Sequence, residues 1–363
     1  MPHPIAAFAA DCHLSRTIWV DRPDIADDSL HSFEQICDWV FKQDLEIPLF
    51  FPGDLFDKNV QDDAYVLAFF VKQMNRLDEA GHKVYHIQGQ HEMTRRVPWA
   101  SLGNCEHLHK KTVKVREFDI YGLDFQPADR LDAALKDIPL TTSILVCHQV
   151  WKELMGGVGN PEGSFEQVPN TVSHIVTGDY HKHFQKTFTF DSGERRHVVS
   201  TGSTHIRSLK EEPEKAFFVL MSDGSFQSIP LDTRPVVYDR VMTPTDLNNI
   251  RHRAFPQHNL KPIWRVEYLH DMEGVRDILK DAAKDKVHLF DKPIGLPKAE
   301  EACEDRQSIV DIYDALKQET GEDELLHQAC AVLLGADEKD LDETIDRLIS
   351  DLKERDWDEL GTN

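Results

Sequence analysis

Residues 47–57 read IPLFFPGDLFD, a short apolar run that passes through proline and glycine into aspartate. An apolar run of this length, ended by turn residues, is typical of a buried strand. Four more strand-like runs in the first half of the chain also lead directly into side chains that can bind metal: IAAFAA, KVYHIQ, SILVC and HIVT. In open α/β sheets, active sites lie at the carboxyl ends of the strands, so this repetition predicts one shared site.

The five motifs that follow these runs combine carboxylate, imidazole and amide side chains. They are Asp11-Cys12-His13, Gly53-Asp54-Leu55-Phe56-Asp57, Gly89-Gln90-His91-Glu92, Cys147-His148 and Gly178-Asp179-Tyr180-His181-Lys182-His183. Oxygen and imidazole ligands suit divalent ions such as Mn²⁺, Mg²⁺, Fe²⁺ or Zn²⁺. Two such ions about 3.5–4 Å apart can hold both the attacking and the leaving oxygen of a phosphate ester. The motifs therefore predict a two-metal phosphoesterase site.

The order of strand-like and helix-like segments predicts the domain organisation. Residues 1–235 alternate between the two, which indicates an α/β domain with two sheets sandwiched between helices. Apolar residues at helical spacing predict helices over 29–43 and 63–81, the second ended by Gly81. Residues 236–299 read as a small α+β domain, and residues 300–363 as three amphipathic helical segments.

Composition and charge narrow the class of protein. A hydrophobic share of 40% and a charged share of 29% are ordinary for a soluble globular protein. No run approaches the ~18 apolar residues of a membrane span, and the N-terminal segment lacks a basic leader, so we expect a cytoplasmic protein. The net charge is −23, and residues 301–363 alone hold 20 acidic and 6 basic residues. This acidity argues against strong DNA binding by the chain alone, although divalent ions bring positive charge to a phosphate.

The six cysteines show no CxxC pair and no regular spacing, so we expect them to be reduced. Cys12 stands between two candidate ligands, which leaves thiol ligation open, but alternation along a strand favours a buried and inert side chain. Cys105, His107 and His109 resemble a metal cluster without a fourth ligand. We therefore expect them to be surface or structural residues.

The order D-x-H, G-D-x-x-D, G-N-H-D/E, H, G-H-x-H resembles the signature of calcineurin-like metallophosphoesterases. GDLFD, ILVCHQ, GDYHKH and the later VVSTGSTHIRSLKEEPEKAFFVL are similar to the SbcD/Mre-type nucleases of double-strand-break repair. The resemblance implies a two-sheet nuclease domain, a small α+β capping domain, and C-terminal helices that bind a coiled-coil ATPase. It is specific over residues 1–235 and only architectural beyond them.

By position, the resemblance also implies a role for each motif residue. Asp11, His13 and His181 would hold the first metal, Asp54 would bridge to the second, and Gln90, His148 and Asp179 would complete the second site. His91 would be the general acid or phosphate-stabilising residue, a role that histidine can fill near neutral pH. Asp57 and Glu92 would orient ligands or His91.

The chain departs from the family pattern at two of these positions. Gln90 replaces the usual Asn, keeping the amide oxygen but adding a methylene, and Asp179 replaces the first His of G-H-x-H. Two registers are open: either Gly178 anchors the motif and Asp179 and His181 are ligands, or His181 and His183 are. We prefer the register anchored by Gly178, because glycine permits the tight turn that presents the next residue.

The resemblance implies a two-metal, Mn²⁺-dependent DNA nuclease: a 3′→5′ exonuclease on duplex DNA and an endonuclease on single strands. It further implies a homodimer bound to an SbcC-like ATPase, which could supply the basic DNA groove that this chain lacks. One alternative is a phosphodiesterase or phosphatase that acts on small nucleotides. Another is a non-catalytic scaffold subunit, with Gln90 and Asp179 marking decay of the site. The compact length and the two ligand substitutions would suit a bacteriophage version of the family.

Overall fold

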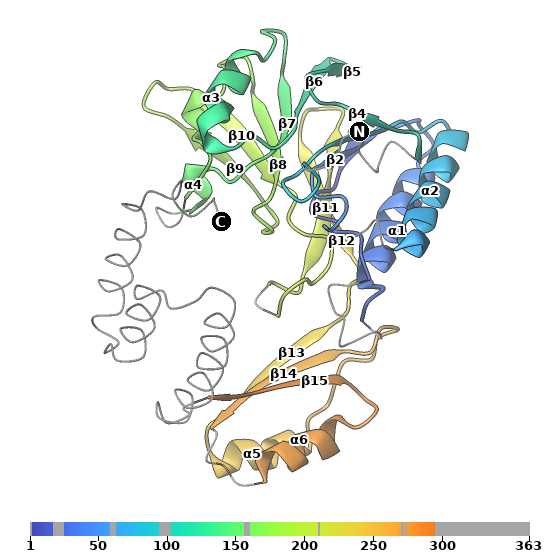
Figure 1. The fold of residues 1–363 in the computed structure, drawn as a ribbon, viewed down its shortest axis with the longest axis vertical. Coiled ribbons are helices and arrows are strands. Elements are labelled where there is room, and N and C mark those ends of the chain that lie inside the picture. The colour runs from blue at the N-terminus through green and yellow to red at the C-terminus, as the bar shows by residue number, and fades with distance from the viewer. Residues whose placement is uncertain are drawn as a thin grey trace, which may run out of the picture. The chain divides into compact units, whose positions relative to one another are not determined.

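The computed structural model describes residues 2–16, 25–58, 63–93, 103–155, 160–209, 211–269, 272 and 274–294 (Figure 1). The predicted helical region 300–363 lies outside these residues. The chain divides into two compact units, each described here by itself. The first comprises Met1–Tyr238, Ala254–Arg265 and Ala283–Phe290, and the second comprises Asp239–Arg253, Val266–Ala282 and the described residues from Asp291 on.

The first sheet has six strands in the order β12-β11-β1-β2-β3-β4. These are β1 (Pro4–Phe8), β2 (Leu49–Pro52), β3 (Val84–Ile87), β4 (Cys105–His107), β11 (Lys215–Met221) and β12 (Phe226–Leu231). Strands β1 to β4 run parallel, whereas β11 pairs antiparallel with β1 and with β12. The carboxyl ends of β1, β2 and β3 therefore lie at the same edge of this sheet.

The second sheet also has six strands, in the order β5-β6-β7-β8-β10-β9. These are β5 (Thr112–Val115), β6 (Phe118–Leu123), β7 (Ile144–His148), β8 (His174–Gly178), β9 (Phe184–Thr189) and β10 (Arg195–Ser200). The central strands β6, β7, β8 and β10 are parallel, and the edge strands β5 and β9 are antiparallel to their neighbours. Two more of the motifs, those after β7 and β8, thus share one edge.

Three apolar clusters hold these layers together. Helices α1 (Asp28–Phe41) and α2 (Ala64–Glu79) lie side by side over one face of the first sheet and pack on it through residues such as Phe33 and Phe70 (Figure 1). Between the sheets, Phe8 and Phe50 pack with Ile120 and other residues of the second sheet. Helices α3 (Ala128–Lys136) and α4 (Lys152–Met155) cover the other face of the second sheet. Strands buried on both faces explain the continuous apolar runs in the sequence, and the predicted two-sheet α/β sandwich is confirmed.

The later part of the described chain forms a small three-stranded sheet, β13-β14-β15. Its strands are β13 (Val236–Val241), β14 (Ile263–Leu269) and β15 (His288–Ile294), with α5 (Pro244–Arg251) and α6 (Val275–Ala283) in the connections. The domain limits at 235 and 299 and the capping role stay predictions. Within the described residues, no helix combines the length and the apolar character needed to cross a membrane.

The cysteines and the Cys105–His109 segment behave as structural residues. Within the described part of the chain, the four cysteines, Cys12, Cys37, Cys105 and Cys147, are buried and free. Cys105 begins β4, and His107 Nε2 bonds the carboxylate of Asp124 at 2.9 Å. Asp124 also accepts the backbone N–H of Gln88 at 2.8 Å, so the cluster ties β6 to the loop that leads into the third motif.

His86 on β3 is a buried histidine whose ring stacks on that of His107 at 5.0 Å. Its side chain is 1% exposed, and neither ring nitrogen has a hydrogen-bond partner among the described residues. Burial, followed by the neighbouring His107, lowers the pKa of His86 to about 3. The native protein therefore keeps this ring neutral in a pH range where the unfolded chain would protonate it.

Replacing His86 with leucine should make the protein less sensitive to acid. Because the native pKa of His86 lies below the unfolded value, its contribution to stability is present above about pH 6.5 and is lost as the pH falls towards 3. From about pH 7.5 to about pH 5, this single side chain should cost about 2 kcal/mol. The free energy of unfolding is measured with urea, in the presence of chelator, at both pH values. Its decrease between the two pH values should be smaller in His86→Leu than in wild type by that amount. The control is His3→Leu, which changes an exposed histidine. An equal decrease in the free energy of unfolding in both variants would refute the proposed contribution of His86 to acid sensitivity.

Candidate active site

The loops after β1, β2, β3, β7 and β8 meet at one place, as the five motifs predict. Backbone bonds hold the first two loops together, since Asp11 N donates to Gly53 O at 3.2 Å and His13 N to Asp54 O at 2.9 Å. The loop after β8 joins them where the backbone N–H of Asp179 donates to the carboxylate of Asp11 at 3.1 Å. Motifs that lie far apart in the sequence thus form one compact polar site.

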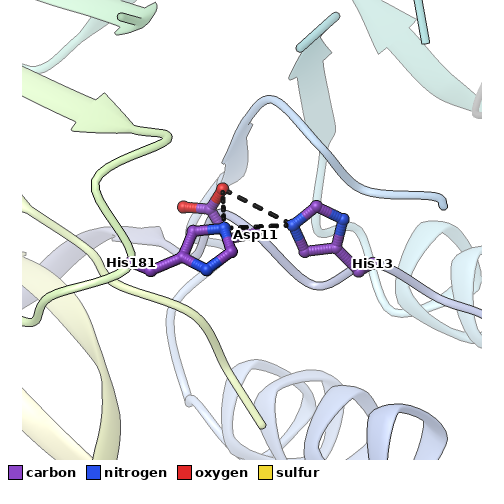
Figure 2. A group of neighbouring side chains, drawn as sticks. All are labelled: Asp11, His13 and His181. Atoms are coloured by element: carbon purple, nitrogen blue, oxygen red, sulfur yellow. Dashed lines mark hydrogen bonds and ion pairs between the residues drawn. The ribbon is translucent and has the colours of Figure 1, made fainter. Parts of the chain in front are cut away.

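Asp11, His13 and His181 form one group of neighbouring ligand atoms (Figure 2). The Nε2 atoms of the two histidines are 3.3 Å apart, and Asp11 Oδ1 lies 3.5 Å from His181 Nε2 and 3.8 Å from His13 Nε2. Asp11 and His13 are fully buried, whereas the side chain of His181 is 25% exposed. These three residues could hold one divalent ion at the mouth of the site.

Asp54 lies between that group and a second one. Its Oδ2 atom is 3.6 Å from His13 Nε2 and 3.6 Å from His148 Nε2, and Asp11, Asp54 and His148 form a further group of neighbouring ligand atoms. Asp54 Oδ2 and His148 Nε2 are buried and have no hydrogen-bond partner among the described residues. A carboxylate oxygen facing imidazole nitrogens on two sides is a donor set that suits two divalent ions with Asp54 between them.

The surroundings of His148 prepare its Nε2 atom for a ligand. Its other nitrogen, Nδ1, donates to the backbone oxygen of Pro52 at 2.7 Å, which turns Nε2 towards Asp54. Burial opposes the charged imidazolium, but Asp54, Asp11 and Asp179 together raise the pKa of His148 to about 10. A metal ion would replace the proton that these carboxylates attract.

Gly53 and Gly178 leave the space that the His148 ring fills. A Cβ atom built on Gly178 would lie 2.5 Å from His148 Nδ1 and 2.6 Å from Pro52 O, and a Cβ on Gly53 would overlap the same ring. Gly53 also has a φ of +87°, a left-handed conformation that favours glycine. The glycine in each Gly-Asp motif therefore makes room for the histidine of the fourth motif.

Gly178→Ala should weaken metal binding and destabilise the fold together. The new methyl group must displace His148 or Pro52, and overpacking of this kind costs about 1–3 kcal/mol. Isothermal titration with Mn²⁺ should show loss of one of two binding events. Gly193→Ala is the matched control, because a Cβ there meets nothing within 4 Å, so only the cost of its φ of +83° should appear. An unchanged Mn²⁺ stoichiometry in Gly178→Ala would contradict this prediction.

The two residues that depart from the family pattern contact each other. Gln90 Nε2 donates to Asp179 Oδ1 at 2.6 Å, and the same oxygen lies 4.0 Å from His148 Nε2. The longer amide of Gln90 and the carboxylate of Asp179 thus bond to each other, and the buried amide oxygen of Gln90 has no hydrogen-bond partner among the described residues.

The register anchored by Gly178 stays a prediction, and the contacts of His183 differ from those of Asp179 and His181. His183 uses both ring nitrogens elsewhere, at 2.9 Å from Thr201 O and 2.7 Å from Ser228 Oγ, and its ring stacks on Phe218 at 4.1 Å. Asp179 and His181 instead face the candidate ligands described above. Cys12 is buried beside Ala10 O, and burial raises the pKa of its thiol well above the usual value. The inert role expected for Cys12 fits this environment.

Five of the candidate ligands have left-handed backbone conformations. Their φ values are +51° at Asp11, +39° at His13, +47° at Asp54, +75° at Asp179 and +56° at His181. This region is uncommon for residues other than glycine, and such residues cluster at functional sites. The sharp turns that follow the strands aim these side chains at one another.

His91 lies at the edge of the metal-ligand groups with its orientation fixed by Asp57. His91 Nδ1 is 3.0 Å from Asp57 Oδ1, and His91 Nε2 points back to within 3.8 Å of Asp54 Oδ2. The His91 side chain is 16% exposed, so a substrate could reach it. Although burial opposes ionisation, the bond from His91 lowers the pKa of Asp57. His13, Asp54 and His91 also form a group of neighbouring ligand atoms, so His91 could bind metal or substrate.

Glu92 holds two loops together rather than facing the ligands. Its two carboxyl oxygens accept backbone N–H groups of Phe56 and Gly89, each at 3.1 Å. Burial, followed by repulsion from Asp54, raises the pKa of Glu92 to about 8. Glu92 therefore positions the second and third motifs relative to each other.

The sequence analysis assigned no role to three charged residues between the end of β10 and the start of β11. Glu211 Oε1 lies 3.2 Å from His181 Nδ1, and Glu211 Oε2 accepts from Lys215 Nζ at 2.9 Å. Burial opposes its charge, but His181 and Lys215 lower the pKa of Glu211 to about 2. Arg207 Nη1 lies 2.9 Å from His13 Nε2. These residues lie in the segment 198–220, whose sequence is similar to the SbcD/Mre-type nucleases. That similarity could have pointed to them, but no spacing rule links the segment to the earlier motifs.

No family model matches this chain. It is 28% identical over 263 residues to the DNA double-strand break repair protein Mre11 of Sulfurisphaera tokodaii, covering 66% of this chain and 67% of that protein. It is 26% identical over 198 residues to Mre11 of Methanosarcina acetivorans, covering 50% of this chain and 31% of that protein.

Solved structures with similar folds are more distant. One is a 5′-nucleotidase precursor from Thermus thermophilus, with TM-score 0.39 and 12% identity, covering 62% of this chain and 54% of that one. Another is a dimetal phosphatase from Danio rerio, with TM-score 0.39 and 11% identity, covering 63% and 99%. The nuclease MPE of Pseudomonas putida has TM-score 0.31 and 14% identity, covering 62% and 87%.

The convergence of the five motifs and the similarity to Mre11 proteins define the class of this protein. It is a metal-dependent phosphodiesterase that resembles the calcineurin-like metallophosphoesterases. Within that class it is similar to the Mre11/SbcD-type nucleases, as its motifs predicted.

Proposed function

We propose that this chain is the nuclease subunit of an SbcCD-like complex and hydrolyses DNA phosphodiester bonds with two divalent ions. The observation that carries the proposal is the position of Asp54 Oδ2, which is buried, lacks a partner among the described residues, and lies 3.6 Å from both His13 and His148. A carboxylate placed between two groups of ligands is what a pair of ions requires. Two relatives named as double-strand break repair proteins support DNA as the substrate.

The proposed ligands divide into two sets that share Asp54. Asp11, His13 and His181 would hold the first ion, and Gln90, His148 and Asp179 the second. The ions would neutralise the phosphate and lower the pKa of the attacking water. We propose Mn²⁺ for both positions, because the resemblance to SbcD/Mre-type nucleases implies it and the carboxylate and amide oxygens among the ligands suit it. His91, held by Asp57, would give its Nε2 proton to the departing 3′ oxygen.

The reaction and the assembly are further parts of the proposal. They comprise 3′→5′ exonuclease action on duplex DNA, endonuclease action on single strands, a homodimer, and an SbcC-like ATPase bound through residues 300–363. The charge of −23 supports the need for such a partner, since a DNA complex requires a basic surface. The proposed setting is the cytoplasm of a bacterial or phage-infected cell.

The proposal is tested with duplex DNA labelled at the 3′ or the 5′ end. The full chain is incubated with Mn²⁺, with and without the ATPase, and Asp54→Asn serves as the control for contaminating nucleases. We expect shortening from the 3′ end that chelator stops. If the protein hydrolyses bis-p-nitrophenyl phosphate but leaves the DNA uncleaved even when the ATPase is present, it is an enzyme that acts on small nucleotides. Fewer than one bound ion per chain and no hydrolysis would indicate a scaffold.

A further inference from the structure

Arg207 places a cation directly at the candidate metal site. Its Nη1 atom lies 2.9 Å from His13 Nε2, and its Nη2 atom lies 3.5 Å from Asp57 Oδ1. A guanidinium can only donate, so His13 Nε2 accepts this bond with the lone pair that would otherwise bind a metal. Arg207 therefore contacts both a proposed metal ligand and the carboxylate that orients His91.

The guanidinium of Arg207 has an unpaired donor among the described residues, whereas the neighbouring cation, Lys215, is buried and bonded to two residues. Lys215 is 3% exposed and is committed to Glu211 at 2.9 Å and to Ser203 at 2.8 Å. The Arg207 side chain is 20% exposed, and its Nε atom has no hydrogen-bond partner among the described residues. Its backbone N–H donates to Glu211 Oε2 at 3.4 Å, which fixes the root of the side chain. Arg207 is thus an anchored, partly exposed cation at the site, and its buried Nε donor is unpaired among the described residues.

A metal ion and Arg207 compete for the same nitrogen of His13. An ion at His13 Nε2 would take its lone pair and repel the guanidinium, while Asp57 would still hold that guanidinium nearby. The donors released in this way would lie beside the ion. Phosphate oxygens are the ligands that guanidinium groups bind best, often through two parallel bonds.

We infer that Arg207 is a substrate-binding residue, which leaves His13 when the first metal binds and then binds the phosphate undergoing hydrolysis. This inference rests on the proposed function. Arg207 would add positive charge to a site whose other described side chains are mainly acidic or histidine. Metal binding would also favour phosphate binding, because the Nη1 donor that contacts His13 would become available to phosphate once the metal had bound. Arg207 would therefore be a catalytic residue that does not bind the metal.

The test compares Arg207→Ala, Arg207→Lys and the exposed Arg195→Ala in the full chain. Arg195 begins β10, at the end of that strand away from the site. Titration calorimetry measures binding of Mn²⁺ and then of inorganic phosphate to the Mn²⁺-loaded protein, and KM is measured with bis-p-nitrophenyl phosphate. In Arg207→Ala we expect the same number of Mn²⁺ ions bound at equal or tighter affinity. In the same variant, phosphate affinity should fall at least tenfold and KM should rise. In Arg207→Lys, phosphate affinity and KM should both lie between the values of Arg207→Ala and wild type.

Phosphate affinity within twofold of wild type in Arg207→Ala would overturn the inference. Loss of Mn²⁺ stoichiometry in that variant would also overturn it, because Arg207 would then support the ligands themselves. The proposed function fails separately: wild-type protein that binds Mn²⁺ and phosphate but leaves DNA intact refutes the nuclease proposal alone. The phosphate titration does not require turnover, so it tests Arg207 in either case.

Discussion

Replacing His91 with alanine should abolish DNA cleavage while the Mn²⁺ stoichiometry stays that of wild type. The proposed role of His91 is to donate a proton to the leaving oxygen, and loss of a general acid typically lowers a rate about 10²–10⁴-fold. The geometry supports this role, since Asp57 holds Nδ1 at 3.0 Å and leaves Nε2 directed at the site. His91 is not one of the three residues of the first-metal group drawn in Figure 2, although it forms a separate group of neighbouring ligand atoms with His13 and Asp54.

Two substrates make this test specific. A DNA 3′ oxygen leaves as an alkoxide and needs a proton, whereas p-nitrophenol is acidic enough to leave without one. The loss in His91→Ala should therefore be much larger on DNA than on bis-p-nitrophenyl phosphate. The exposed His252→Ala is the control. A DNA cleavage rate of His91→Ala within tenfold of wild type would show that His91 is not the general acid. Loss of a bound Mn²⁺ ion in this variant would show that His91 is a metal ligand instead.

Asp54→Asn should remove both metal ions and all hydrolysis. The amide keeps an oxygen to accept the backbone N–H of His91, now bonded by Asp54 Oδ1 at 3.1 Å, so the local fold should survive. Its NH₂ group replaces the oxygen that lies between His13 and His148, and an NH₂ group cannot bind a cation. Loss of an outer partner of a metal ligand already costs about 10–100-fold in affinity, so loss of a shared ligand should cost ~100-fold or more.

Metal analysis of the purified variant after dialysis against Mn²⁺ checks this expectation. The exposed Asp129→Asn on α3 is the matched control, since it removes the same charge from a residue outside the ligand groups. Unfolding by urea in chelator should be similar for Asp54→Asn and wild type, which separates metal loss from misfolding. Two tightly bound ions in Asp54→Asn would refute the bridging role of Asp54.

The sequence predicted the sandwich and the convergence of the motifs because both follow from local pattern. The apolar runs at β2 and β7 and the helical spacing of α1 are each visible within one segment. Strand β12 and helix α3 escaped prediction, since β12 alternates only weakly and α3 is short, with Leu131 and Leu135 as its large apolar residues. The position of β12 depends on its pairing at the edge of the first sheet, and the position of α3 depends on its packing on one face of the second sheet.

Within the site, the sequence could predict which loops meet but not which side chains pair. The bond from Gln90 to Asp179 joins residues 89 positions apart, and it links the two departures from the family pattern. Arg207 is more distant still, 194 positions from His13. Neither contact leaves a spacing signal, because both depend on how two separate sheets bring their loops together.

The left-handed turns at the five candidate ligands bear on how the protein would acquire its metal. The left-handed conformation is uncommon even for aspartate and histidine, which adopt it more readily than most residues, and five such turns together indicate that the folded sheets on either side hold them. The cage would then exist before any ion arrives, and ions could enter and leave without unfolding the chain. In such a cage the resident ion would follow the supply of divalent metals in the cell, and a change in that supply would be a direct means of regulation.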